Sequence, residues 1–510
     1  MTGRPATVVA ALIVLLTLPA IGAQVAGPPS LDLFFAAASP DNRVAKAALD
    51  TLAGQWRDSY TPMIIDMARL LRPAPRPAPP SGGADIGAAP TDGTEDDEGV
   101  RSLGAELAAA PGVGVTRESM IRSRLISFLE KQTRKRFDLS LNGWRAWMWS
   151  LPYEPHPDYA RFKGMVYGGG VDQRMQRFFP SGAKSLIRLD EIDWGGVTVN
   201  GIPPLYYPKV LPAADARYLR DGNIVFGVVV NGQPRAYPKR ILAWHEMAID
   251  TLGGTEITVV YCTLCGTVIP YDSVVGGKRR GFGTSGLLYR SNKLMFDEET
   301  MSLWSTLEGK PVVGALVAAG LQMTSHAAVT TSWGEWRAEH PNTTVLSLDT
   351  GHKRDYGEGA AYRDYFSNDR LYFEVSKKDR RLKNKDEVLV MHVKPVAGGA
   401  AQPVAVAADF LIRTPVFHFE VAGRRLLAVT SPKGANRVYA LGGHDVVFQS
   451  RPVTGDLVDT AGRTWRRGED ALTLADGSIT LPRFVAQRAF WFGWYAQYPA
   501  TLLLGREAVP

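Results

Sequence analysis

The stretch Ile224-Val-Phe-Gly-Val-Val-Val-Asn-Gly-Gln-Pro-Arg-Ala-Tyr237 carries the pattern that decides the fold class of this chain. β-Branched and aromatic residues run up to Asn231-Gly232, a dipeptide that favours a tight turn between two antiparallel strands. We therefore predict a β-hairpin at this position. From about residue 180 onward the sequence keeps this character, so we expect an α+β protein that is mainly β, with a helical N-terminal region.

The residues that follow the hairpin predict further strands and short helices. Residues 241–249 are expected to form one short helix that carries Trp244-His245-Glu246. Residues 256–261 predict a strand, and residues 267–271 predict another. The remaining predictions are strands at 287–289 and 293–296 and a short helix at 331–339.

Between the strands at 256–261 and 267–271 lies Cys262-Thr263-Leu264-Cys265-Gly266, which holds the only two cysteines among 510 residues. The two are three positions apart, close enough to share one disulfide or one metal ion. We therefore expect a compact β-rich domain with a CxxCG turn, and the chemistry of the protein at Cys262 and Cys265.

The composition of the chain divides it into segments of different character. Its length suggests two or three domains, and 45% apolar residues allow sizeable cores. A Pro/Ala/Gly-rich and then acidic stretch cannot bury enough surface to offset its ordering entropy, which predicts a disordered linker. The expected segments are a signal peptide at 1–26, a helical segment at 30–72, the linker at 73–103, a helical and tryptophan-rich region at 104–180, a cysteine-bearing domain at 181–395 and a related domain without cysteines at 396–510.

The N-terminus has the features of an export signal. Arg4 precedes an almost wholly apolar run from Ala6 to Leu18, and small residues follow between 20 and 26. This run is shorter than the roughly 20 residues of a membrane span, so we expect no permanent span; an uncleaved N-terminal anchor is the alternative. The mature chain is expected in the periplasm or outside the cell, where disulfides persist. The net charge of +7 is not gathered into a basic stripe, which argues against a nucleic-acid partner.

The sequence also suggests an internal repeat. The segment Trp333-Gly-Glu-Trp336-Arg-Ala-Glu-His-Pro-Asn-Thr343 is similar to Trp491-Phe-Gly-Trp494-Tyr-Ala-Gln-Tyr-Pro-Ala-Thr501. Extending the match backward places Cys262-x-x-Cys265-Gly266 opposite Thr430-x-x-Lys433-Gly434. We therefore predict that the C-terminal region is a degenerate copy that keeps the fold and lacks both thiols.

A series of motifs between residues 202 and 393 resembles the bacterial family catalogued as domain of unknown function 3179. The matching motifs are Arg235-Ala-Tyr-Pro238, Ile241-Leu-Ala-Trp-His-Glu246, Tyr261-Cys-Thr-Leu-Cys-Gly-Thr267, Phe282-Gly-Thr-Ser-Gly286, Ser302-Leu-Trp-Ser305 and Thr331-Ser-Trp-Gly-Glu-Trp-Arg337. Some members carry selenocysteine in the cysteine motif, so the resemblance implies redox chemistry there. Thr263 stands where proline is usual in the family, a departure expected to affect the turn and the thiol potential.

Several functions remain open for the cysteine pair. A structural disulfide would close a short ring and contribute only about 2 kcal/mol through the unfolded chain. A redox-active dithiol, for thiol–disulfide or peroxide-type chemistry, would react with an unknown redox partner or small-molecule substrate, one cysteine attacking and the other resolving. A metal-binding or carrier module would hold Cu or Zn between Cys262, Cys265 and His245, although no cofactor is certain from the sequence. A non-catalytic binding scaffold is a further alternative, and the redox dithiol is our leading prediction.

Other residues are candidates for supporting roles around the thiols. His245 is expected to tune a thiol or to share a proton with it, because histidine titrates near neutral pH. Arg354 is a candidate for stabilising a thiolate, which needs nearby positive charge. The remaining supporting candidates are Tyr261, Glu246, Asp272 and Tyr289.

Overall fold

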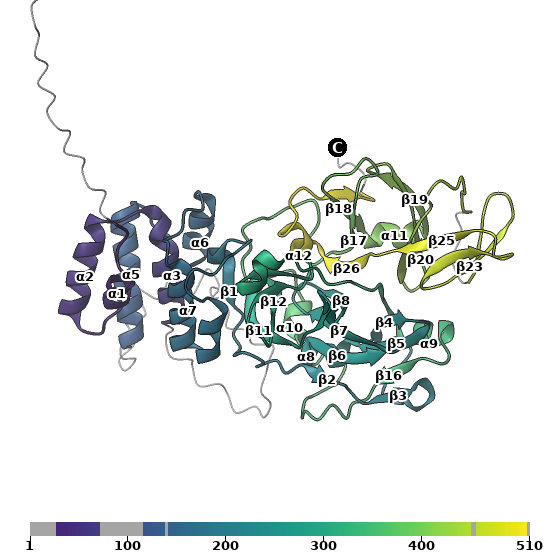
Figure 1. Cartoon of the computed structure of the whole chain (residues 1–510), viewed down its shortest axis with the longest axis horizontal. Helices are drawn as coiled ribbons and strands as arrows, with labels where there is room; N and C mark the ends of the chain where they lie inside the picture. Colours follow the sequence, from purple (N-terminus) through teal and green to yellow (C-terminus); the bar gives the residue numbers. More distant parts are fainter. Residues whose placement is uncertain (1–26, 72–115, 138–140, 450–454, 507–510) are drawn as a thin grey trace, which may run out of the picture.

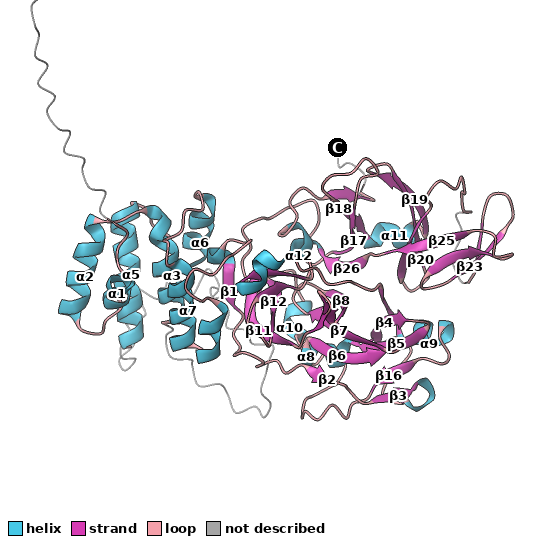
Figure 2. Ribbon diagram, in the orientation of Figure 1, coloured by secondary structure: helices cyan, strands magenta, loops and turns pink. Residues whose placement is uncertain are grey.

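The computed structural model describes residues 27–71, 116–137, 141–449 and 455–506. Helices occupy the N-terminal part, and strands fill most of the remainder (Figure 1, Figure 2), which confirms the predicted β-rich fold with a helical N-terminal region. The predicted signal peptide and linker lie outside the described residues. None of the helices within these four ranges is long and apolar enough to cross a membrane.

The helical region packs its apolar faces around one core. Its second helix begins after Asp41, whose carboxylate accepts hydrogen bonds from two backbone N–H groups, and the third has Pro62 in its first turn. The core extends to Leu287, Leu294 and Val313 of the β-rich part, so the helices cover one of its sheets. The helices are α1 (Leu31–Ala37), α2 (Asn42–Gly54), α3 (Thr61–Leu70), α5 (Arg117–Thr133), α6 (Leu141–Ser150) and α7 (Tyr159–Gly170).

The β-rich part begins with a unit that carries the two cysteines, which we call the thiol unit (residues 192–366). Its elements are β1 (Ile192–Trp194), β2 (Leu205–Tyr206), β3 (Val210–Pro212), β4 (Ile224–Val230), β5 (Gln233–Pro238), α8 (Lys239–His245), β6 (Met247–Leu252), β7 (Thr255–Cys262), β8 (Thr267–Asp272), β9 (Val274–Val275), β10 (Lys278–Arg279), β11 (Phe282–Tyr289), β12 (Asn292–Asp297), β13 (Leu303–Ser305), β14 (Lys310–Val313), β15 (Ala328–Ser332), α9 (Trp333–Glu339), β16 (Thr344–Leu346) and α10 (Arg363–Phe366). They form the sheets β15-β4-β5-β16-β3, β2-β6-β7-β8, β1-β11-β12-β13-β14 and the ribbon β10-β9.

The unit that follows, which we call the thiol-free unit (residues 387–504), has the order of elements that the predicted repeat requires. Its elements are β17 (Glu387–Val393), β18 (Gln402–Ala407), α11 (Ala408–Arg413), β19 (Val416–Val421), β20 (Arg424–Thr430), β21 (Asn436–Ala440), β22 (Leu457–Val458), β23 (Thr464–Arg467), β24 (Ala471–Leu474), β25 (Thr480–Phe484), β26 (Gln487–Phe490), α12 (Trp491–Tyr495) and β27 (Leu502–Leu504). They form the sheets β26-β17-β18-β27 and β19-β20-β21-β25-β24-β23-β22.

Strand pairing supports the correspondence between the two units. In the thiol unit β4 pairs antiparallel with β15, and β5 pairs parallel with β16. In the thiol-free unit β17 pairs antiparallel with β26, and β18 pairs parallel with β27. In addition, Trp304 and Trp465 each donate an indole N–H to an aspartate, Asp297 and Asp459 respectively. The repeat thus extends from the order of elements to individual side-chain contacts.

Two details of the sequence-based prediction differ from the structure. The helix expected over 241–249 is wrong in its second half, because α8 ends at His245 and Glu246 adopts a left-handed conformation (φ 55°) that turns the chain into β6. The boundary expected at 395/396 falls between β17 and β18, which pair with each other in one hairpin.

Candidate functional site

The two cysteines occupy the turn between β7 and β8. Cys262 is the last residue of β7 and lies opposite Thr267, and the backbone N–H of Cys265 donates to the carbonyl of Cys262 at 3.1 Å. Gly266 has φ 63°, a conformation that disfavours residues with a Cβ. Both cysteines are free thiols, with 4% of Cys262 and none of Cys265 exposed. The turn therefore brings two unbonded thiols together beneath the surface.

The thiol-free unit seals Cys265. The backbone N–H of Phe490 donates to the carbonyl of Cys265 at 2.7 Å, and the Cys265 thiol donates to the carbonyl of Ser291 at 3.3 Å. A Cβ added to Gly493 of α12 would lie 3.3 Å from the sulfur, so any larger residue at this position would press on the thiol. Burial, followed by the hydrogen bond to Cys262 and its negative charge, raises the pKa of Cys265 well above its ordinary value. Cys265 is thus held as the protonated partner of the pair.

A buried ion pair lies beside Cys262. The Lys293 ammonium donates to the backbone carbonyl of Glu246 at 3.0 Å and lies 3.4 Å from its carboxylate. The hydroxyl of Tyr362 donates to the other carboxylate oxygen of Glu246 at 3.2 Å. Burial lowers the pKa of Lys293, and the negative charges of Glu246 and Cys262 act in the opposite direction. Lys293 is thus a buried cation held by Glu246 and electrostatically coupled to Cys262.

A cavity of about 130 Å³ opens onto this ion pair. Its polar wall is formed by Glu246, Lys293 and Tyr362, and one of its apolar walls is Leu264, which lies between the two cysteines in the sequence. The other lining residues are Gly195, Gly196, Val197, Ile202, Thr284, Gly286, Leu287, Leu288 and Phe373. The site therefore combines a dithiol, a buried cation and a small, largely apolar chamber.

His245 is engaged away from the thiols. Its Nδ1 donates to the carbonyl of Pro203 at 2.8 Å, and its Nε2 accepts from the hydroxyl of Tyr356 at 2.6 Å. Burial lowers the pKa of His245 to about 4, opposed by the bond to Pro203, so the ring is neutral at neutral pH. Arg354 lies in the same group, with its guanidinium 6.0 Å from the ring centre of Trp244. His245 and Arg354 thus lie in one cluster beside α8. In this cluster Pro203 and Tyr356, and not a cysteine, bind the imidazole nitrogens of His245.

The other supporting candidates are distributed around the unit. Tyr261 precedes Cys262 but packs its ring on Phe226, with ring centres 4.8 Å apart. Asp272 lies at the far end of β8, where it bonds His326 at 2.6 Å. Tyr289 ends β11, and burial raises its pKa. Of the supporting residues that the sequence predicts, Glu246 is the one that lines the cavity.

The sequence analysis missed several residues of the site. The sequence does single out Lys293, because a lone cation precedes the apolar run Leu294-Met-Phe296 in a predicted strand. No sequence pattern identifies Tyr362 or Tyr365 as site residues, because both lie in a long segment without a strong periodicity. The Tyr365 hydroxyl donates to the carbonyl of Leu264 at 2.8 Å and so fixes the cysteine turn. Gly493, the cover of Cys265, is 228 positions further along the chain.

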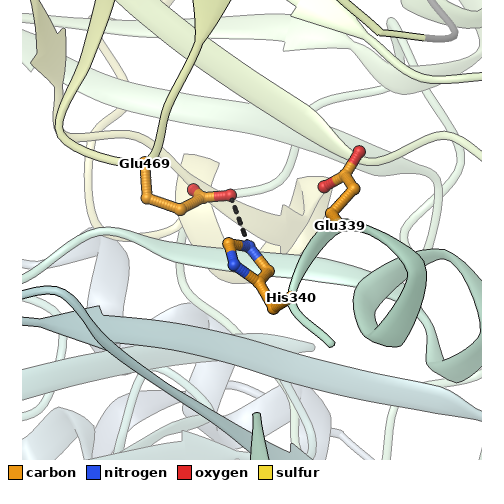
Figure 3. Close-up of side chains that lie close together, drawn as sticks. All are labelled: Glu339, His340 and Glu469. Carbon is orange, nitrogen blue, oxygen red and sulfur yellow. Dashed lines mark hydrogen bonds and ion pairs between the residues drawn. The ribbon is translucent and has the colours of Figure 1, made fainter. Parts of the chain in front are cut away.

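A second cluster of titratable groups lies where α9 of the thiol unit meets the thiol-free unit (Figure 3). Ligand atoms of Glu339, His340 and Glu469 lie within 4.8 Å of one another, and the figure shows His340 facing the Glu469 carboxylate. Guanidinium groups already bind both carboxylates, and Arg437 contacts each of them at 2.5 Å. The arginines of this network are Arg437, Arg467 and Arg483. A metal ion would have to displace or sit among these cations, so the cluster is an ion-pair network.

Comparison with known proteins gives a family and no assigned activity. No curated protein sequence and no solved structure matches the chain. A family model described as "Protein of unknown function (DUF3179)" matches residues 199–501, a range that includes the thiol unit's cysteine turn and the thiol-free unit with its α12. The match covers more than half of the 510 residues, and the chain belongs to the DUF3179 family.

Proposed function

We propose that this chain is an exported redox protein that performs thiol–disulfide or peroxide-type chemistry at Cys262 and Cys265. The observation that carries the proposal is a cavity whose wall holds both the buried Lys293 and Leu264, which lies between two buried free thiols in the sequence. A thiolate is the reactive form of cysteine, and a nearby cation favours it.

The two cysteines have different roles in this proposal. Cys262 is electrostatically coupled to Lys293, whereas Cys265 is covered by Gly493 and holds its proton. The Lys293 ammonium, which is paired with Glu246, is the buried positive charge that would favour a thiolate at Cys262. Cys262 is therefore the attacking residue and Cys265 the resolving residue.

The competing functions receive less support. A disulfide inside so short a ring contributes about 2 kcal/mol, which does not account for a buried lysine and a cavity beside it. The proposed metal site needs His245, whose two ring nitrogens are bound to Pro203 and Tyr356. With both sulfurs in reach of each other and the imidazole engaged elsewhere, we favour dithiol chemistry over metal binding.

The native mass of the purified full-length protein, before and after mild reductant and chelator, tests the proposal. We expect a loss of two hydrogens on oxidation with dimethyl disulfide, a disulfide small enough for a buried thiol, reversed by dithiothreitol. In Cys265→Ser the reaction should stop at a mixed disulfide, with the mass of one methylthio group attached to Cys262. Cys262→Ser should give no such adduct under the same conditions.

A second comparison isolates the role of the lysine. Lys293→Met should slow the oxidation by about 100-fold, the usual magnitude for removing a proton-transfer group. Lys278→Met on the exposed β9–β10 ribbon removes only a surface ion pair with Glu299 and serves as the matched control. Extra mass that a chelator removes, in place of reversible loss of hydrogen, would overturn the redox proposal.

A further inference from the structure

We infer that the substrate of this dithiol is a small hydroperoxide, which enters the cavity lined by Glu246, Lys293 and Tyr362. The inference rests on the proposed function and adds the class of substrate to it. It stands on two observations: the burial of both sulfurs, and the size and lining of the cavity next to them.

Burial excludes a disulfide carried on the surface of a folded protein. Only 4% of Cys262 and none of Cys265 is exposed, and the backbone of Phe490 and Gly493 closes the turn from the side of the thiol-free unit. Attack on a disulfide requires the thiolate to reach the target sulfur in line with the breaking bond. A small molecule in the cavity would lie against Leu264 and Lys293, one residue of the cysteine turn and the cation coupled to Cys262, whereas a protein disulfide would first require α12 and the turn to separate.

The volume of the cavity limits the ligand to a few heavy atoms. At about 130 Å³ it is slightly smaller than the roughly 150 Å³ cavity that accepts benzene in another protein. Leu264, Leu288 and Phe373 form apolar walls that would contact a short alkyl group of the ligand. A hydroperoxide without an alkyl group would also fit. The cavity thus fits hydrogen peroxide or a short-chain alkyl hydroperoxide.

The polar wall suits the O–O bond of such a ligand. Lys293 has three N–H donors, and its contacts in the described structure are to the carbonyl and the carboxylate of Glu246, which leaves one donor for a ligand oxygen. That donor can protonate the alkoxide or hydroxide that leaves as the O–O bond breaks. The same ammonium group that stabilises the Cys262 thiolate therefore also serves the leaving group.

The reaction balances with the two cysteines as the source of both electrons. The Cys262 thiolate attacks one peroxide oxygen, an S–O bond forms, the O–O bond breaks, and the leaving oxygen takes the proton of Lys293 to give an alcohol or water. Cys265 then attacks the Cys262 sulfur, an S–S bond forms, and the hydroxide that leaves combines with the Cys265 proton to give a second water. An added dithiol such as dithiothreitol reduces the new disulfide and is itself oxidised.

The test uses the full-length reduced protein and four oxidants: hydrogen peroxide, tert-butyl hydroperoxide, cumene hydroperoxide and dimethyl disulfide. Formation of the Cys262–Cys265 disulfide is followed by mass and by intrinsic tryptophan fluorescence. We expect hydrogen peroxide and tert-butyl hydroperoxide to react about 100-fold faster with the wild type than with Lys293→Met. For cumene hydroperoxide the wild type and Lys293→Met should react at similar rates, because the volume of this molecule exceeds that of the cavity.

A variant that fills the cavity provides an independent readout. Leu288→Trp should slow the peroxide reaction at least tenfold, while Val274→Trp, at an exposed position of β9 away from the cavity, should react like the wild type. The size series compares the wild type with Lys293→Met, so the inference stays testable if the Leu288 variant does not fold.

The outcomes separate this inference from the proposed function. If dimethyl disulfide forms the reversible Cys262–Cys265 disulfide but peroxides react no faster than with free cysteine, the substrate inference fails and the redox proposal stands. Rapid reduction of a protein disulfide, such as that of insulin, would also overturn the substrate inference. If no oxidant yields a reversible disulfide, both fail.

Discussion

The thiol unit and the thiol-free unit have the same order of strands and helices, yet they place different chemistry at the same turn. In the thiol unit Cys262 ends β7 and Cys265 is one of the four residues before β8, whereas the five residues between β20 and β21 of the thiol-free unit include no cysteine. A helix of the other unit packs on each turn: α12 contributes Phe492 and Gly493 near Cys265, and α9 contributes Trp333 and Trp336 to the cluster that contains Ala435. Both units therefore have a turn that is covered by a helix of the other unit, and the two turns differ in the side chains that they carry.

The difference extends to the charges beside each turn. The thiol unit has one buried cation, Lys293, with Glu246. Beside the turn of the thiol-free unit, Arg437 binds both Glu469 and Glu339, the last residue of α9. Four predictions test this contrast between the units, in order of decreasing expected effect.

Arg437→Met should destabilise the protein most, by about 3–5 kcal/mol, because it removes the buried arginine that the partly buried Glu339 and Glu469 share. Burial alone would raise the pKa of Glu469, and Arg437, with His340 and Arg483, holds it well below its ordinary range. Urea denaturation at neutral pH measures the loss. Arg425→Met is the matched control, since its partner Asp445 is 94% exposed and the pair should contribute less than about 1 kcal/mol. Equal losses in the two variants would contradict the assignment of a buried network.

Acidification should destabilise the thiol unit through His245. The folded pKa is about 4, below the ordinary value of 6.5, so the unfolded chain binds the proton first as the pH falls. Stability should be full above pH 6.5 and should fall by on the order of 3 kcal/mol between pH 6.5 and 4. Urea denaturation across this range should show a smaller fall in His245→Gln. The corresponding helix end of the thiol-free unit carries Arg413, paired with Asp409 at 3.0 Å, in place of an imidazole. An identical pH profile in the variant would count against a buried neutral imidazole.

Gly493→Val should cost about 1–3 kcal/mol, because its side chain would overpack the space against Cys265. The added Cβ would lie 3.0 Å from the Cys265 Cβ and 3.3 Å from the sulfur. The variant should also label faster with iodoacetamide at Cys265, tested in a Cys262→Ser background. Gly443→Ala, where no described atom lies within 4 Å of the added Cβ, is the control and should be nearly neutral. Unchanged labelling together with unchanged stability would argue against α12 as the cover of the thiol.

Tyr362→Phe should have the smallest effect on stability, about 1 kcal/mol, because it removes one hydrogen bond to the Glu246 carboxylate. Tyr439→Phe removes a comparable bond, from its hydroxyl to the carbonyl of Gly468 at 2.8 Å in the thiol-free unit. The two variants should be similar in stability, and only Tyr362→Phe should change the rate of thiol oxidation. A change of rate in both variants would mean that the rate reports general loosening and not the site.

The fold was largely predictable from local patterns. The hairpin at 224–237 and the strands around the cysteines follow from β-branched residues and turn dipeptides that act within a few positions. The similarity between the tryptophan-containing segments 333–343 and 491–501 predicts the repeat from the sequence alone. The one clear error, the helix extended to residue 249, arose because nothing in the local pattern shows that Glu246 adopts a left-handed conformation and ends α8.

The site was less predictable than the fold. The cysteine pair and Glu246 were identifiable from spacing and proximity in the sequence. His245 and Glu246 are adjacent in the chain, but the end of α8 sends the imidazole toward Pro203 and the carboxylate toward Lys293. Lys293, Tyr362 and Gly493 join the site through long-range packing, and no short-range pattern encodes which distant segments meet.

The exchange of covering helices has a consequence for how such a protein can diversify. In a symmetric dimer of identical units, one sequence would have to serve both as the thiol turn and as the cover of the partner's thiol turn. Joining the two units in a single chain removes that constraint, so position 493 can be glycine above Cys265 while the matching position, Glu335, bonds Thr331 at 2.6 Å. The thiol-free unit can then change in ways that cover the thiols, and the thiol unit can change in ways that make the thiols reactive. A fragment containing either half alone would lose one of these two roles.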